Sequence, residues 1–297
     1  MTVPSATRPP PARRRFLAAT LAGAAALTLA RPAAASRLEK GFAPKPELWE
    51  RWAAHVPGAT ARVDHAAWDA FLRAHVQVAA MGLNRVDYGA VPAADRQALD
   101  AYVAMLAGTP VSSLDLPEQF AYWVNFYNAL TVKVVLDHYP VRSIRDIDIS
   151  PGLFADGPWK RKLVTVEGEG LSLDDMEHRI LRPIWRDPRI HYAVNCASVG
   201  CPNLQPEAFT AANADRLMEA GAKAYINDPR GVSFGAEGAV ASKIYLWFQV
   251  DFGDTDAGVL EHMRRYAAPE LAARLAGVRE FADFAYDWTL NGAMART

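Results

Sequence analysis

The sequence predicts an α+β fold, with a mixed or antiparallel sheet packed with helices in a single domain that follows a cleaved signal peptide. Two observations predict this fold. Several long segments have apolar residues at the three- and four-residue spacing of one helix face, and shorter segments between them are rich in β-branched and aromatic residues. The two kinds of segment do not alternate strictly, which favours α+β over a doubly wound parallel sheet.

The first 35 residues have the layout of an export signal. A basic region precedes an apolar stretch over residues 16–30, and the segment ends in three alanines at 33–35. The apolar stretch is shorter than the roughly 20 residues that a membrane-spanning helix needs. Arg-Arg-Arg-Phe-Leu at 13–17 fits the twin-arginine export pattern, which carries folded proteins. We expect a cleaved signal over 1–35; an uncut membrane anchor is the alternative.

Removal of this segment changes the charge of the chain. It holds five arginines and no acidic residue, so the remaining chain has 27 basic and 33 acidic residues and a net charge of about −6. No basic stripe results, and we therefore expect no nucleic acid partner. No later segment is long and apolar enough to span a bilayer. We expect a protein of the periplasm or cell exterior, without stable membrane insertion after signal cleavage.

Residues 36–46 are predicted to form a flexible leader, and one domain is expected over 47–297. Asp64 suits the cap of its first helix, Gly108 ends the second, and Pro117 suits the first turn of the third. Ser172 and Asp175 resemble a capping box for the fourth, with Asp in place of Glu. The predicted helices cover residues 64–77, 92–108, 116–140, 172–183, 208–228, 256–267 and 269–278.

Three segments are predicted to contain strands. The first is residues 160–168, before a turn at 168–170. The second follows a turn within 187–198 and carries "HYAVNC". The third, 239–253, is the longest and is rich in β-branched and aromatic residues. Together with the predicted helices, these strands complete the α+β assignment.

Six motifs resemble one family. They are "YWVNFYNALT", "LSLDDMEHRILRP", "DPRIHYAVNCASVGCPNL", "YINDPRG", "SKIYLWFQVDFG" and "YDWTLN", in the family's order and spread over roughly residues 86–291. The family is the domain of unknown function 547, found in exported bacterial proteins and in plants. The resemblance implies no established activity, although a relation to papain-like or transglutaminase-like cysteine enzymes is conceivable. The family's polar motif positions fall on Asn125, Asn128, Glu177, His178, His191, Cys196, Cys201 and Asp251.

Cys196 and Cys201 are the two cysteines of the chain, and four interpretations stay open for them. In an oxidising compartment they would pair, although so short a loop stabilises by only about 2 kcal/mol. A nucleophile needs a nearby base and a lowered thiol pKa. A metal site is the third interpretation, but Cys-x₄-Cys is not a standard zinc spacing, and no metal or cofactor is predicted. Inert buried thiols are the fourth interpretation.

Cys196 is the preferred nucleophile, because Cys201 precedes a proline that offers no backbone N–H. The base would be His178 or His191. In a regular strand His191 points away from Cys196, so the chain would have to turn before the two could meet. A papain-like order of Cys then His would have to use His262, the histidine that follows the cysteines.

Asn125 and Asn128 lie three residues apart and face nearly the same way on one predicted helix. They are either core amides bonded to loop backbone or groups that orient a substrate carbonyl or an imidazole. Trp123 on the same helix is a binding candidate. The other binding candidates are Glu177, Cys201 and Asp251.

Two functions follow. The first is a cysteine-dependent hydrolase or transferase acting on amide bonds in the envelope, in which Cys196 attacks, His178 or His191 is the base, and Asn125 or Asn128 orients. The alternative is a non-catalytic periplasmic binding module with a structural Cys196–Cys201 disulfide. In either case the expected ligand is small or peptide-like.

Overall fold

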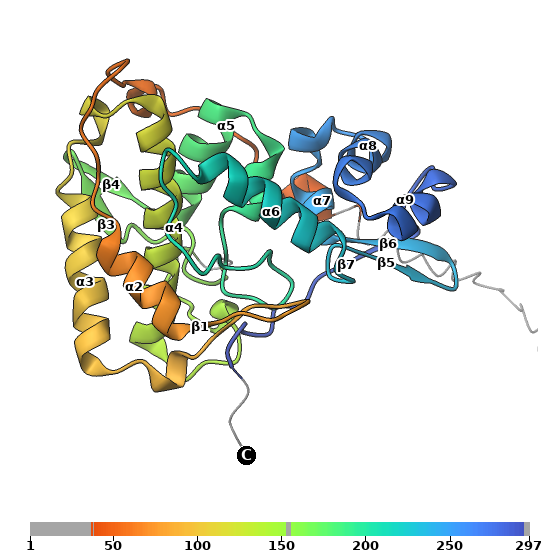
Figure 1. The fold of residues 1–297 in the computed structure, drawn as a ribbon, viewed down its shortest axis with the longest axis horizontal. Helices are drawn as coiled ribbons and strands as arrows, with labels where there is room; N and C mark the ends of the chain where they lie inside the picture. Colours follow the sequence, from red (N-terminus) through yellow and green to blue (C-terminus); the bar gives the residue numbers. More distant parts are fainter. Residues whose placement is uncertain (1–36, 38, 153–155, 294–297) are drawn as a thin grey trace, which may run out of the picture. The chain divides into compact units, whose positions relative to one another are not determined.

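The computed structural model of the protein describes residues 37, 39–152 and 156–293. The predicted export signal therefore lies outside the described residues. The described chain combines helices with three small sheets, which confirms the predicted α+β class (Figure 1). Within these ranges no helix has the length and apolar character needed to cross a membrane.

The helices agree with the predicted positions to within a few residues, with two exceptions. The helix predicted over 208–228 begins only at Ala214, and a short helix lies at Lys243–Trp247, where a strand was predicted. The α-helices are α2 (Ala66–His75), α3 (Ala93–Ala107), α4 (Leu116–His138), α5 (Arg182–Trp185), α6 (Ala214–Ile226), α7 (Lys243–Trp247), α8 (Asp256–Tyr266) and α9 (Pro269–Ala276). A π-helix, Asp175–Leu181, leads directly into α5. Short 3₁₀-helices are Lys40–Phe42, Glu50–Ala53, Tyr88–Ala90, Val111–Ser113, Ile144–Asp146, Pro188–Tyr192 and Gln249–Phe252.

The sheets are small and lie at the edges of the helical body. The strands are β1 (Val76–Gln77), β2 (Arg85–Val86), β3 (Val164–Val166), β4 (Glu169–Leu171), β5 (Val232–Gly235), β6 (Gly238–Ser242) and β7 (Asp283–Ala285). β1 pairs with β2 and β3 with β4, both antiparallel. β6 pairs antiparallel with β5 and parallel with β7, so the third sheet is mixed.

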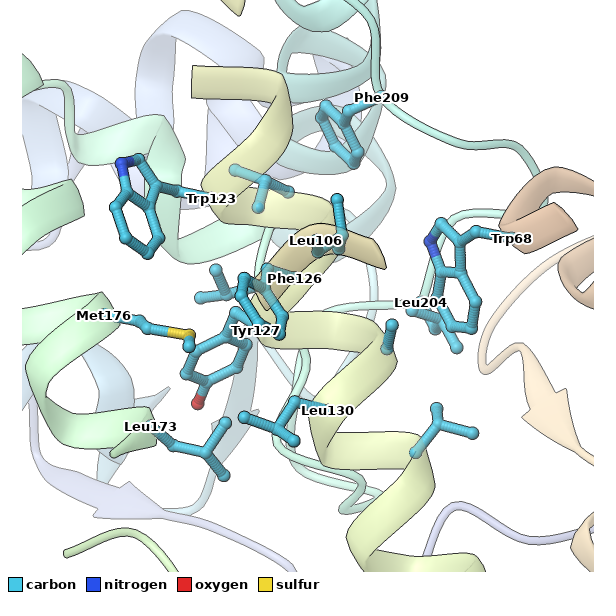
Figure 2. Close-up of a cluster of buried hydrophobic side chains, with 14 of the residues drawn as sticks. Trp68, Leu106, Trp123, Phe126, Tyr127, Leu130, Leu173, Met176, Leu204 and Phe209 are labelled. Atoms are coloured by element: carbon cyan, nitrogen blue, oxygen red, sulfur yellow. The ribbon is translucent and has the colours of Figure 1, made fainter. Parts of the chain in front are cut away.

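Helix α4 is the centre of the larger core. It begins where the Asp115 side chain accepts a hydrogen bond from Glu118 N, with Pro117 in its first turn. Nearly all of its residues are buried, and it packs against α3 and against the π-helix. Figure 2 shows Tyr127 and Leu130 of α4 facing Met176 of the π-helix and Leu173, which precedes it. A second core lies between α6, α8 and the mixed sheet.

Residues 191–196 do not form a strand, which corrects the prediction for 187–198. The Asp187 side chain caps a 3₁₀-helix that starts at Pro188 and ends at Tyr192. Beyond it, the Asn195 side chain accepts from Ala197 N at 2.9 Å, and Ala197 has a φ of 60°. These local bonds turn the chain, so the alternation that would separate His191 from Cys196 does not apply.

The predicted strand over 239–253 is also shorter than expected. β6 ends at Ser242, whose hydroxyl accepts from Ile244 N at 3.2 Å and caps α7. A 3₁₀-helix follows, and Gly253 ends it with a φ of 89°, where a glycine avoids strain. Asp251 therefore lies on a 3₁₀-helix rather than at the end of a strand.

The described residues of the predicted leader lie against the domain. Arg37 pairs with Asp256 at 2.7 Å, and the Lys40 ammonium lies 2.6 Å from Gln249 Oε1 and 2.7 Å from Asp254 Oδ1. These contacts place residues 39–44 beside α7 and next to the cavity described below.

Candidate active site

A cavity of about 720 Å³ brings together most of the polar residues singled out from the sequence. They come from the π-helix, from the turn and loop after α5, and from the segment after β7. Asn125, Asn128, Trp123 and Asp251 are not on its wall. The cavity residues that matter for chemistry are Glu177, His178, His191, Cys196, Cys201 and Tyr286.

Cys196 is half-buried, with its sulfur among hydroxyl groups. Its Sγ lies 3.0 Å from Tyr286 Oη and 3.2 Å from Ser198 Oγ. A hydrogen bond from the Cys201 thiol, followed by those from Ser198 and Tyr286, lowers the pKa of Cys196 to about 7 despite its burial. A substantial fraction of Cys196 is therefore thiolate at neutral pH.

Cys201 is buried, and burial raises the pKa of its thiol well above the usual value. Its Sγ accepts a hydrogen bond from Cys196 N at 3.1 Å. Both cysteines are free thiols in the structure, which thus lacks the disulfide of the alternative function. The two sulfurs differ chemically, because one is activated and the other supports it.

The Asn128 side chain bonds to the backbone of the loop that carries Cys196 and Cys201. Its Nδ2 donates to Ala193 O at 2.9 Å, and its Oδ1 accepts from Asn195 N at 2.8 Å. Asn125 makes the same pair of bonds to Phe209, at 2.7 and 2.9 Å, outside the cavity. Both are core amides bonded to loop backbone, and only Asn128 acts on the site, through the loop. Trp123 is fully buried and packs edge-on against Trp52, with ring centroids 5.2 Å apart.

His191 is oriented by Asp251. Its Nε2 lies 2.7 Å from Asp251 Oδ2, and the same oxygen accepts from Arg182 Nε at 2.6 Å. These bonds lower the pKa of Asp251 although its burial opposes them, so the carboxylate is ionised and His191 carries its proton on Nε2. Burial lowers the pKa of His191, which leaves Nδ1 as a free acceptor. That atom lies 3.7 Å from Glu177 Oε1.

His178 has the same Nε2–H tautomer, but here Nδ1 is the nitrogen held by a partner and the Nε2–H is the available group. Arg182 Nη1 donates to its Nδ1 at 3.0 Å, and a guanidinium has only protons to offer. The proton of neutral His178 is therefore on Nε2, 3.8 Å from Asp174 Oδ1. Burial, aided by Arg182, lowers the pKa of His178 well below its usual value. Hence His178 is a donor on this wall, whereas His191 is an acceptor.

Glu177 lies between the two imidazoles, with Oε1 also 4.0 Å from His178 Nδ1. Burial raises its pKa to about 8, although Arg182 and a hydrogen bond with Tyr127 oppose the shift. The negative charge of Cys196 raises it further. At pH 7 the group is a neutral carboxylic acid, next to a thiol whose pKa is lower.

Sequence reasoning missed several residues that build this site. Asp174 and Arg182 are two of them. Together with His178, which was predicted, they recur every four residues, the spacing of one helix face, and this was the available signal. Tyr286 lies in the motif "YDWTLN" but was not singled out as a site residue. Ser198 and Tyr127 gave no signal beyond their position. His262 is buried in the second core, where its Nε2 lies 2.9 Å from Tyr192 Oη, away from the cavity.

No group of three or more His, Cys, Asp or Glu that could hold a metal ion occurs within residues 37, 39–152 and 156–293. The unusual features of the site are the low thiol pKa and the high carboxyl pKa in one cavity.

Comparison with known proteins gives a family and nothing finer. Residues 111–226 match the family described as "Protein of unknown function, DUF547", which confirms the resemblance over that range. The match includes Glu177, both histidines of the cavity and both cysteines, but ends before Asp251 and Tyr286. No curated protein and no solved structure matches the chain.

Proposed function

We propose that this protein is a cysteine-dependent hydrolase or transferase that acts on amide bonds, with Cys196 as its nucleophile. The observation that carries the proposal is the position of Cys196 Sγ, 3.0 Å from Tyr286 Oη on the wall of a cavity that also holds Glu177, His178 and His191. An activated thiol, an acid and an oriented imidazole are the groups that acyl transfer requires.

The first half of the reaction depends on the pKa of the Cys196 thiol being lower than that of the Glu177 carboxyl. The Cys196 thiolate attacks the carbonyl carbon of a bound amide, and the His178 Nε2–H donates to the developing oxyanion. The C–N bond breaks, and the leaving amine takes the proton of the Glu177 carboxyl. A thioester on Cys196 and an ionised Glu177 remain, so charge and protons balance.

The second half restores both groups. Water, or an acceptor amine in a transferase, attacks the thioester and gives its proton to the base. His191 Nδ1 and the Glu177 carboxylate lie 3.7 Å apart and can share this proton. The C–S bond breaks, the thiolate returns, and Glu177 ends in its acid form. Asp251 holds His191 in the required tautomer throughout.

The test is the reactivity of the two cysteines, compared in one matched pair of variants. Iodoacetamide is expected to modify Cys196 of the wild-type protein with a rate that rises through a midpoint near pH 7. Cys196→Ser should lose this labelling by at least about 100-fold, because the buried Cys201 stays protonated. Cys201→Ser should keep the labelled position but shift the midpoint upward. Intact mass and peptide mapping follow the modification.

A second measurement looks for the covalent intermediate. Wild-type protein mixed with acylated amino acid amides and quenched in acid should gain the mass of an acyl group, and Cys196→Ser should not. Equal labelling of both cysteines, or none below pH 9, would overturn the proposal. A quantitative Cys196–Cys201 bridge in protein taken from the cell, with no reactivity after reduction, would instead support the binding module.

We also propose that the protein is exported through the twin-arginine route to the periplasm or cell exterior, where its small or peptide-like ligand would be found. The support is the layout of residues 1–35 in the sequence. Substituting Arg13 and Arg14 together by Lys should leave the protein in the cytoplasm with an unprocessed N-terminus. Unchanged fractionation and N-terminal mass in that variant would contradict export by this route.

A further inference from the structure

An aromatic wall leads from Cys196 to the far side of the cavity. Tyr286, whose hydroxyl contacts the sulfur, packs against Trp247 and Trp288, with ring centroids 5.0 and 4.7 Å away. Trp247 and Trp288 are themselves 5.6 Å apart. A substrate that places an amide at Cys196 would therefore extend along these rings.

At the end of this wall two donors converge on one carboxylate. The Lys243 ammonium lies 2.6 Å from Glu39 Oε1, and Trp247 Nε1 donates to Glu39 Oε2 at 3.4 Å. Lys243 and Trp247 are one turn apart on α7, so both side chains face the same way. The pair forms a two-point cradle for a carboxylate, one donor for each oxygen.

Glu39 occupies this cradle but is not needed to hold its own segment. That segment is docked by Arg37 on Asp256, by Lys40 on Gln249, and by Pro44 O, which accepts from Arg182 at 2.8 Å. The Glu39 side chain is 44% exposed, and ion pairs that are open to solvent contribute little stability. Another carboxylate can therefore displace it without undocking the segment.

The other charged groups of this cavity have partners of their own. Arg145 lies over the Trp288 ring, 5.3 Å from its centroid, and pairs with Asp156, whereas Glu177 is a neutral acid at pH 7. The charge of Lys160 acts on Asp174, where it opposes the rise that burial causes in the pKa of that carboxyl to about 6. Lys243 is the cation of this wall that shares its carboxylate with a ring N–H, that of Trp247.

We propose that Lys243 and Trp247 form a carboxylate-binding subsite of the Cys196 site, and that Glu39 fills it in the free protein. The substrate is then an amide that carries a carboxylate, either an acidic side chain or a free terminal carboxyl. This inference rests on the proposed function, since it names the substrate class of that site. Glu39 acts as a competing ligand within the chain.

The experiment measures binding in the full chain by calorimetry, with three probes of one size. N-acetylglutamate α-amide carries a side-chain carboxylate, N-acetylglutamine a terminal one, and N-acetylglutamine amide none. Glu39→Gln should bind at least one acidic probe about tenfold more tightly than wild type, and the neutral probe equally. The acidic probe that gains identifies the source of the carboxylate. Lys243→Met in the Glu39→Gln background should remove the gain, and Trp247→Phe should reduce it.

A gain for all three probes, no gain for either acid, or a gain that survives Lys243→Met would overturn the subsite. Melting temperatures confirm that each variant is folded. Iodoacetamide labelling of Cys196 in the same variants separates the two proposals. Acid-selective binding with an unreactive Cys196 would support the subsite and contradict the proposed enzymatic function. A reactive Cys196 without acid-selective binding would support the enzymatic function and contradict the subsite.

Discussion

Two buried polar regions lie on or beside α4, and their side chains are hydrogen-bonded in different ways. In one, Asn125 and Asn128 each donate to and accept from loop backbone. In the other, Glu177 and His191 face each other at 3.7 Å on a cavity wall, and one carboxylate oxygen of Asp251 serves two donors. The two asparagines, Glu177 and His191 are all buried, and Asp251 is partly buried.

The difference shows that burial of polar groups does not by itself mark a functional site. An amide has no charged form at neutral pH, so two backbone bonds satisfy it and fix a loop. Burial instead shifts the pKa of a carboxyl or a thiol. Such a group can still bind a ligand when it has to share its hydrogen-bond partners with a neighbouring group. The first region stabilises the fold, whereas the second costs stability and, under the proposed function, carries the reacting groups.

The largest expected effect tests the region of the amides. Asn125→Ala and Asn128→Ala each leave two buried backbone groups unpaired, and each should lower the free energy of unfolding by about 3 to 5 kcal/mol. Urea denaturation measures this loss. Asn128→Ala should also slow alkylation of Cys196, because it frees the loop at Asn195, whereas Asn125→Ala should not. The same labelling rate in both variants would break the distinction between them.

The next effect has the opposite sign and tests the cavity. The pKa of Glu177 is raised from 4.5 to about 8 in the folded protein. The fold therefore loses stability as the pH rises from about 4.5 towards 8, because the unfolded chain releases a proton that the folded one keeps. Glu177→Gln should add about 2 to 4 kcal/mol at pH 8 and nothing at pH 4, by urea denaturation at both pH values.

Glu118→Gln is the matched control for this change. Glu118 is a buried residue of α4 whose Oε1 accepts from Val63 N at 2.8 Å and whose Oε2 lies 3.7 Å from Arg62 Nε, so its replacement removes a favourable pairing and should not stabilise the fold at pH 8. A Glu177→Gln protein that is less stable than wild type at pH 8 would place Glu177 with the asparagines, as a structural group.

The smallest effect sharpens the description of the thiol. Tyr286→Phe keeps the aromatic ring but removes a hydroxyl 3.0 Å from Cys196 Sγ. Loss of that hydrogen bond should raise the pKa of Cys196 and slow its alkylation at pH 6 by up to about tenfold. Tyr245→Phe removes a hydroxyl from the second core, 3.1 Å from Tyr192 Oη, and should leave the profile unchanged. An unaltered profile in Tyr286→Phe would exclude this hydroxyl from thiolate stabilisation.

The sequence was sufficient for the helices with clear ends. Asp115 and Pro117 define the start of α4, and Ser172 with Asp175 forms the expected reciprocal cap, at 2.8 and 3.2 Å. It failed where short-range side-chain bonds override composition. Aromatic and β-branched residues suit a strand, but Ser242 caps a helix within the run that was predicted as one.

The candidate site could be predicted in its members but not in their roles. His191, Cys196 and Asn128 were singled out, yet the tautomers depend on Arg182 and Asp251, which meet only in the folded chain. No local pattern links Asp251 to His191, and none separates Asn125 from Asn128, since both occupy similar helix positions. Asp251 was proposed for binding, and it orients an imidazole from behind the wall.

Arg182 gives the site a dependence on the order of assembly. Its guanidinium donates to Pro44 O, to His178 and to Asp251. The Cys196 sulfur is contacted by the hydroxyl of Tyr286, which lies near the other end of the described chain. The segment around Pro44 and the segment around Tyr286 must both be in place before the acid, the base and the thiol are aligned. Under the proposed function, Cys196 gains its lowered thiol pKa and its catalytic neighbours only when both segments have packed, whereas a partly folded chain would hold an ordinary thiol.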